Sequence, residues 1–227
     1  MATIIQHPEV DNSDIIRLPE VGTSDLIRRL KRTTLIGRIM NPEFQNVESL
    51  VQMMPKLWKL ENRVVGMDLG LGTFKFDFER EEDILEVMKN EPFNFNQWMV
   101  SIVRWEPIIH KNYPSAITFW VRISGVPLRF STDETFRGIG DELGTVQEVD
   151  EDNAMVKVTI DSTKPLCFEM PVWFETGGEQ LVVEMQYEKL FGYCESCFSL
   201  RHDKESCPER ELRKHVLAKE EEDKDLS

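Results

Sequence analysis

The chain has 227 residues, a formal net charge of −14, 41% hydrophobic content and four cysteines. Natural domains cluster near about 100 to 150 residues, so this length predicts two compact units with tails. Because Lys and Arg supply most of the non-specific affinity for nucleic acid, the acid excess argues against a long-range electrostatic grip on DNA or RNA.

No stretch approaches the roughly 18 uninterrupted apolar residues that span a bilayer, and the first twenty residues lack a basic start followed by an apolar run. We therefore expect a soluble, intracellular protein, in the nucleus or the cytoplasm, with no membrane partner. Three of the four cysteines cluster, which indicates thiolate ligands in a reducing compartment. Cys167 stands apart and is expected to pack as a small buried apolar residue.

Residues 1–22 are mixed in character and interrupted by prolines, so we expect a flexible arm. The stretch TSDLIRRLKR then predicts a short helix with Leu26, Ile27 and Leu30 on one face. The opposite face carries a basic quartet, Arg28, Arg29, Lys31 and Arg32. This quartet is a candidate nuclear-import or phosphate-binding patch, while a solvated helix face is the simpler interpretation.

Residues 23–107 predict a ferredoxin-like domain behind that short helix. The order from Thr33 is strand, helix, strand, strand, helix, strand, or βαββαβ, which RNA-recognition motifs (RRMs) also use. The first helix, NVESLVQMMPKLWKL, is expected to kink or restart at Pro55. FNFNQWMVSIVRW is expected to form one closing strand. The positions predicted to face inward from the two helices are Val47, Leu50, Val51, Met54, Leu57, Trp58, Ile84, Leu85 and Met88.

The central strand GTFKFDFER decides whether this sheet resembles an RNA-binding surface. Period-two alternation sends Phe74, Phe76 and Phe78 inward. The outward positions are then Thr73, Lys75 and Asp77, none of which offers a flat face for a base. We therefore predict a protein-packing scaffold with an RRM-like outline.

Residues 108–190 predict a second, small α+β unit. ITFWVRISGVP reads as a strand, and STDETFRGIGDELG as a helix with a capping box between Ser131 and Glu134 that ends at Gly144. TVQEVD and MVKVTID form a hairpin, and EQLVVEMQYEKL supplies one more strand. A knuckle at 191–209 and a charged helix with an acidic tail at 210–227 complete the chain.

The segment CESCFSLRHDKESC carries the clearest chemical signal. Cys194, Cys197, His202 and Cys207 follow the spacing CX2CX4HX4C, and three thiolates with one imidazole suit tetrahedral Zn(II). Chance clustering is the alternative. Four protein ligands leave no open position for water, so one structural zinc ion is favoured over a catalytic one. The loops are too short to form a core, so metal binding has to supply the folding energy.

Four further marks, in this order along the chain, resemble a plant domain of unknown function that precedes such a knuckle. They are the GR after the first strand, MP-x-x-W in the first helix, F-x-F-x-F-x-REED, and YEKL before the knuckle. The resemblance covers about residues 30–210. That family includes gag-like proteins of LINE-type non-LTR retrotransposons and their host-genome relatives. It implies a nucleic-acid-binding component that accompanies a reverse transcriptase encoded elsewhere, with self-association or the reverse transcriptase as possible protein contacts.

Knuckles of this kind bind single-stranded nucleic acid by placing unstacked bases against apolar side chains, with Lys and Arg near the phosphates. Phe198 and Leu200 are the candidates for the apolar shelf. The candidate phosphate contacts are Arg201, Lys204 and Lys189. Arg201 stands where retroviral knuckles usually carry glycine. An alternative role for Phe198 is to pack the knuckle's own small core.

No nucleotide cradle, nucleophile elbow or metalloprotease motif occurs, so we expect no enzymatic activity and no small-molecule substrate. Acid clusters such as Glu81–Asp83 and Asp150–Asp152 are better explained as solvated surface than as nuclease ligands. The leading hypothesis is a zinc-dependent accessory protein that binds single-stranded RNA or DNA weakly through its knuckle. The alternative is a zinc-stabilised protein-interaction module that docks a basic partner.

Overall fold

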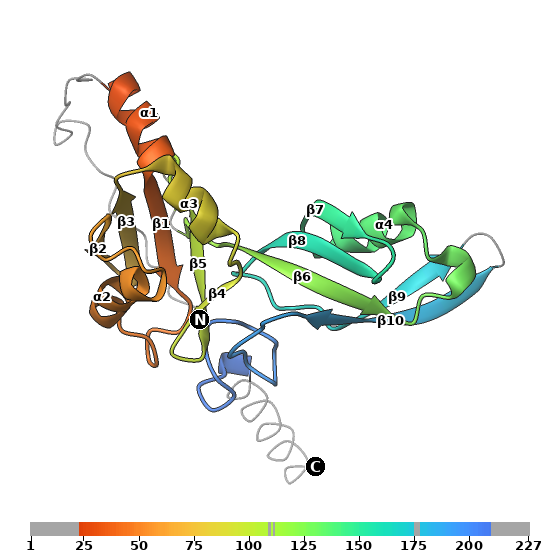
Figure 1. The fold of residues 1–227 in the computed structure, drawn as a ribbon. Coiled ribbons are helices and arrows are strands. Elements are labelled where there is room, and N and C mark those ends of the chain that lie inside the picture. Colours follow the sequence, from red (N-terminus) through yellow and green to blue (C-terminus); the bar gives the residue numbers. More distant parts are fainter. Residues whose placement is uncertain (1–22, 109, 111, 175–177, 210–227) are drawn as a thin grey trace, which may run out of the picture.

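A computed structural model describes residues 23–209 apart from 109, 111 and 175–177. It contains two five-stranded antiparallel sheets, with the cysteine-rich segment beneath both (Figure 1). Among the described residues, no helix is both long and apolar enough to cross a membrane. The arm expected at 1–22 and the charged tail expected at 210–227 lie outside the described residues.

The first sheet has the strand order β2-β3-β1-β5-β4. Helices α2 and α3 cover one of its faces, and helix α1 projects beyond the end of the central strand β1 (Figure 1). The predicted βαββαβ order is therefore confirmed, with a leading helix and one extra short strand. The elements are α1 (Thr23–Thr33), β1 (Thr34–Ile39), α2 (Val47–Leu57), β2 (Val64–Gly70), β3 (Thr73–Phe78), α3 (Glu81–Met88), β4 (Phe93–Phe95) and β5 (Trp98–Arg104).

The core of this first unit is the phenylalanine ladder of β3. Phe74, Phe76 and Phe78 are buried, as the alternation predicts, and Trp58 packs edge-on against Phe76 at 4.8 Å between ring centroids. Each such ring removes a large apolar area from water, and every Å² of apolar surface buried stabilises the fold by about 25 cal/mol. Gly37 lies opposite Phe74 in β1, where a Cβ would come within 2.3 Å of the ring. The glycine therefore makes room for the ladder.

Three details of the first unit differ from the sequence predictions. Helix α2 does not restart at Pro55 but ends two residues later. Leu57 and Leu85, predicted to face inward, are 63% and 54% exposed, while Val87 is buried in place of Leu85. The predicted single closing strand is the hairpin β4–β5, because Asn96 and Gln97 adopt positive φ values that turn the chain.

The second sheet has the strand order β7-β8-β6-β10-β9. Its elements are β6 (Ala116–Ser124), the 3-10 turn η2 (Leu128–Phe130), α4 (Asp133–Leu143), β7 (Thr145–Asp150), β8 (Met155–Asp161), β9 (Glu169–Phe174) and β10 (Glu179–Tyr187). Helix α4 packs against β7 and β8. The predicted helix, hairpin and last strand are all present, so the mixed α+β class is confirmed for this unit too.

Two local predictions for the second unit were wrong. The N-cap of α4 is Thr132, whose side chain accepts a hydrogen bond from Thr135 N, while Ser131 donates to Pro127 O instead of capping. Strand β9 was not predicted at all. Cys167, expected to be buried, is only partly buried, and its Sγ lies 3.2 Å from Glu169 O.

The two units meet along β5 and β6. Ser101 Oγ donates to Ala116 O at 2.7 Å, Arg38 Nη2 donates to Tyr113 O at 3.0 Å, and Met99 lies in the core of the second unit. Met99 and Ser101 point away from the helices of the first sheet and are both fully buried. The second unit therefore covers part of the surface on which RRM sheets bind bases.

Candidate metal centre

The four predicted metal ligands are brought together. The ligand atoms of Cys194, Cys197, His202 and Cys207 all lie within 4.8 Å of one another, and Cys197 Sγ is 3.2 Å from His202 Nε2. A tetrahedron with arms of about 2.3 Å has edges of about 3.8 Å, so these four atoms fit around one Zn(II) ion. Cys194 and Cys207 are buried, and the other two ligands are partly exposed.

The backbone positions these ligands through two tight turns. Phe198 N donates to Cys194 O at 2.7 Å, and Cys194 N donates to Ser199 O at 2.8 Å. Phe198 adopts φ +61 to close the first turn. In the second turn, Ser206 N donates to Asp203 Oδ1 at 2.8 Å, and this bond lowers the pKa of that carboxyl. The CX2C spacing thus places both sulfurs on the inside of one turn.

The thiols differ in their readiness to lose a proton. Burial acts to raise the pKa of Cys194, but hydrogen bonds from the backbone of Ser196 and Cys197 and from the neighbouring thiols outweigh it, and the pKa lies below its ordinary value. Burial, together with the neighbouring Cys194 and Cys207, raises the pKa of Cys197 to about 11. A bound cation removes this conflict, because it stabilises all the thiolates at once.

The knuckle is packed against the second unit. Leu200 is fully buried within the core of that unit, and Leu166 N donates to Phe198 O at 2.9 Å. On the same side, the Phe168 ring lies 5.3 Å from that of Phe198 and 5.2 Å from that of Tyr193. These contacts fix the knuckle's orientation.

The first unit holds the other side of the knuckle. Gly192, at φ +57, lies so close to the β4–β5 hairpin that a Cβ would come within 2.6 Å of both Gln97 O and the Trp98 ring. Nearby, Phe191 N lies 3.2 Å from Met99 Sδ, and Ser206 Oγ donates to Glu43 Oε2 at 3.1 Å. The knuckle therefore contacts both units.

The predicted nucleic-acid contacts fare differently. Phe198 is 41% exposed and remains available as a shelf, although its ring also packs on Phe168. Leu200 is 0% exposed because it packs in the core of the second unit, so it is not accessible to a base in this structure. Lys204 is exposed but paired with Glu195 at 3.0 Å.

Two predicted cations complete the set. Lys189 is exposed at φ +55 just before the knuckle, and Arg201 is partly exposed. Burial and the nearby positive charge of Arg201 both lower the pKa of the Arg38 guanidinium in β1. Arg38 of β1 thus brings a cation of the first unit close to Arg201 of the knuckle, a proximity that no sequence signal indicates.

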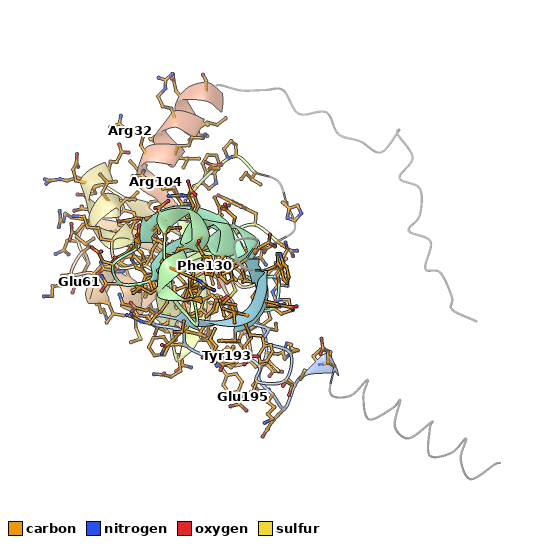
Figure 2. The ribbon with its side chains drawn as sticks, turned by 90° about the vertical axis from the view of Figure 1, so that its right-hand side faces the viewer. Arg32, Glu61, Arg104, Phe130, Tyr193 and Glu195 are labelled. Carbon is orange, nitrogen blue, oxygen red and sulfur yellow. The ribbon has the colours of Figure 1, made fainter. Side chains whose placement is uncertain are left out.

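The aromatic support of the knuckle was also missed by sequence reasoning. Phe168 precedes β9 and Tyr193 follows β10, at the same end of this strand pair, and the Phe168 ring contacts both Tyr193 and Phe198. Tyr193 and the acidic Glu195 lie on the same face of the molecule in Figure 2. The aromatic pair FGY at 191–193 was a possible signal, but its partner Phe168 becomes visible only once strand β9 is in place.

Comparison with known proteins supports both parts of this description. Residues 28–110 match a family described as a domain of unknown function, DUF4283, and residues 160–209 match a family described as a zinc knuckle. A curated relative, the uncharacterized protein At4g02000 of Arabidopsis thaliana, is 32% identical over 138 residues, which cover 57% of this chain and 44% of the relative. The chain thus spans less than half of that relative's length.

Solved structures give weaker likenesses. A structure described as an Sxl-lethal protein/RNA complex is 14% identical, covering 69% of this chain and 81% of that one, with a TM-score of 0.29. The RNA-binding domain of Hrp1 in complex with RNA is 12% identical, covering 70% and 98%, with a TM-score of 0.30. At such scores the likeness carries no argument about function.

Proposed function

We propose that this chain, which joins a DUF4283 domain to a zinc knuckle, is a non-enzymatic accessory protein that binds single-stranded RNA or DNA through the knuckle. The observation that carries the proposal is the pairing of a four-ligand site with an exposed aromatic ring on the same turn. Cys197 supplies a ligand, and Phe198 beside it is 41% exposed at φ +61. One zinc ion, when bound, supplies the folding energy of that turn.

The local charges support weak binding. Lys189, Arg201 and Lys204 lie within nine residues of Phe198 in the sequence, while the whole chain carries a net charge of −14. Each phosphate neutralised on a single strand contributes about −0.7 to the slope of log K against log salt concentration. Three cations therefore give an expected slope of about −2, with binding confined to low salt.

The first test replaces Phe198 by asparagine and measures binding of a fluorescent single-stranded RNA at about 50 mM salt. Asparagine tolerates a positive φ, so the turn is kept while the ring is lost. Stacking on one aromatic contributes about 1 to 3 kcal/mol, so affinity should fall about 5-fold to 150-fold. A matched control, Trp173→Ala, removes an exposed aromatic from β9 and should bind normally. Equal binding by both variants would refute the proposal.

The second test uses the ion pair that occupies Lys204. Replacing Glu195 by glutamine frees this lysine, so RNA affinity should rise about twofold to fivefold and the salt slope should steepen by about 0.7. Replacing Arg201 by glutamine should do the opposite. Unchanged slopes in both variants would mean that these cations do not contact phosphate.

A second candidate function is a protein-interaction module that docks a basic partner, which the acid excess favours. A salt slope near zero for RNA, or no RNA binding at about 50 mM salt, would favour it. For the biological role, we propose a gag-like, retrotransposon-derived accessory factor or a host-captured relative, inside the cell and in either nucleus or cytoplasm. Co-purification of element RNA in crosslinked tissue extracts tests that role, which fails if only unrelated RNA or none is recovered.

A further inference from the structure

The second unit has an apolar groove of ≈ 520 Å³ between helix α4 and strand β9. The floor of the groove is the face of the second sheet that also packs against the core of that unit. Residues along it include Ile139 of α4 and Met170, Val172 and Phe174 of β9. None of the last three sits at the centre of the core, because β9 is the edge strand of its sheet.

The groove exists because the second unit lacks a helix that the first unit has. In the first sheet, the connection from the central hairpin strand β3 back to β5 contains α3, which packs over the core. In the second sheet the equivalent connection, from β8 to β10, contains strand β9, which pairs at the edge. One helix, α4, is left to cover this face, and it lies over β7 and β8.

The α4 wall of the groove carries a glutamate at each end and a glycine, without a side chain, between them. Glu134 and Glu142 stand eight residues apart, about 12 Å along the helix. Within the described part of the chain, neither forms an ion pair. Between them lies Gly138, where a Cβ would meet nothing within 4 Å. The wall therefore leaves a dent of side-chain size flanked by negative charge.

Helix α1 has the opposite properties. It projects from the first sheet (Figure 1), and Leu26 near its free end is 48% exposed. Its base is attached through Arg32, which binds Glu81 at 2.9 Å, and Figure 2 shows Arg32 close to Arg104, the second partner of that carboxyl. An isolated helix shorter than about 12 residues is marginal in water, so the projecting turns gain from a partner.

The charges on α1 suit the groove. At 100° per residue, Leu26, Ile27 and Leu30 form one apolar stripe. Arg29 and Lys31 flank this stripe on its two sides. Whichever way the helix lies along the groove, one of these two bases would face the acidic α4 wall, and the opposite charges would attract.

We propose that the groove between α4 and β9 binds helix α1 of a second copy of this chain, with Leu26 over Gly138 and a base of α1 beside Glu134 or Glu142. This contact is independent of the knuckle and of nucleic acid. Because α1 and the groove are different surfaces at well-separated places in Figure 1, the contact is head-to-tail. Each added copy leaves one free α1 and one free groove, so assembly continues past the dimer.

The test uses full-length, zinc-loaded, nuclease-treated protein in sedimentation velocity over about 5 to 200 µM. The mass should rise with concentration beyond that of a dimer, and less so at about 0.5 M salt. In Gly138→Leu, the new side chain fills the groove, and leucine favours the helix more than glycine does. This variant should therefore be monomeric. Leu26→Asp removes the stripe and should be monomeric too. Leu71→Asp, at a 98% exposed leucine in the β2–β3 turn, should assemble as the parent does.

The decisive experiment mixes the two monomeric variants. Gly138→Leu retains its α1 and Leu26→Asp retains its groove, so an equimolar mixture should give a dimer and nothing larger. A parent protein that stays monomeric, variants that assemble normally, or a mixture that stays monomeric each overturns the proposal. So does an assembly that disappears on removal of residues 210–227 yet survives Leu26→Asp, because that segment would then be the occupant of the groove.

Discussion

The two sheets have the same strand order around their central strands, β1 and β6, but they complete their cores differently. The first unit closes its core with its own two helices, α2 and α3. The second has one helix and takes Leu200, together with the flanking Leu190, Phe191 and Tyr193, from the knuckle segment. The first unit is thus self-sufficient, whereas the second depends on the segment that carries the four candidate metal ligands.

Removing zinc is the strongest way to separate the two units. Without the ion, the knuckle loses folding energy of about 10 kcal/mol or more, and Leu200 loses its fixed position in the second core. Hydrogen exchange after chelation should therefore accelerate in β6 and β10 before it does in β1 and β3. Replacing Cys207 by serine should reproduce this pattern. Equal acceleration in both sheets would show that they unfold as one body.

A matched pair of core leucines gives the next largest effect. Leu200 and Leu50 are both fully buried, one from the knuckle and one from α2. Replacing either by alanine should cost about 2 to 5 kcal/mol of unfolding free energy. Leu200→Ala should also weaken zinc affinity, while Leu50→Ala should leave it unchanged, as competition with a metal indicator would show. If zinc affinity is the same in both, the knuckle folds independently of the second core.

The junction between the units makes a smaller, pH-dependent contribution. Burial raises the pKa of Glu91 to about 7, against the opposing effect of Lys157 from β8. Between pH 4.5 and 7 the folded state holds more protons at this carboxyl than the unfolded state, so stability falls as pH rises through that window. Glu91→Gln should therefore be about 1 to 2 kcal/mol more stable than the parent at pH 8 and equal to it near pH 4. A constant difference in urea melts across that range would contradict this.

The smallest expected effect is that of Gly138 in α4, and Gly140 of the same helix provides a contrast. Gly138 faces the groove with free space around it, so Gly138→Ala should stabilise the second unit by about 1 kcal/mol through helix propensity alone. At Gly140, a Cβ would meet Val146 Cγ2 at 2.7 Å, so alanine there should destabilise by about 1 to 3 kcal/mol. Thermal unfolding of both variants checks the opposite signs. Shifts of the same sign would mean that the groove is closed in solution.

Sequence periodicity predicted the first sheet well because its signals are local. The alternation of Phe74, Phe76 and Phe78 predicted the inward face, and the strict CX2CX4HX4C spacing predicted which four side chains come together. Leu57 and Leu85 were misplaced because helical period alone does not tell which edge of an apolar stripe faces the core. The hairpin turn at Asn96 and Gln97 was missed because two polar residues in an apolar run resemble the alternation of a strand.

The second unit was harder to predict because its decisive contacts are non-local. Strand β9 contains Pro171, which favours a loop in sequence reasoning and is tolerated here because β9 is an edge strand. The burial of Leu200 depends on a core made by β6, β8 and β10, so no property of the knuckle sequence indicates it. The aromatic contact between Phe168 and Phe198 likewise depends on strand pairing.

Gly192 has a consequence for how a polymer would run across the molecule. The Gly192 backbone packs directly against Trp98 and leaves no room for a side chain. This close contact restricts rotation of the knuckle relative to the first unit. A single-stranded nucleic acid bound at the knuckle would then run in one fixed direction relative to both sheets. The spacing between neighbouring copies on a long RNA would then be set by the size of the protein. Inserting a few flexible Gly-Ser residues after Gly192 would make that spacing irregular.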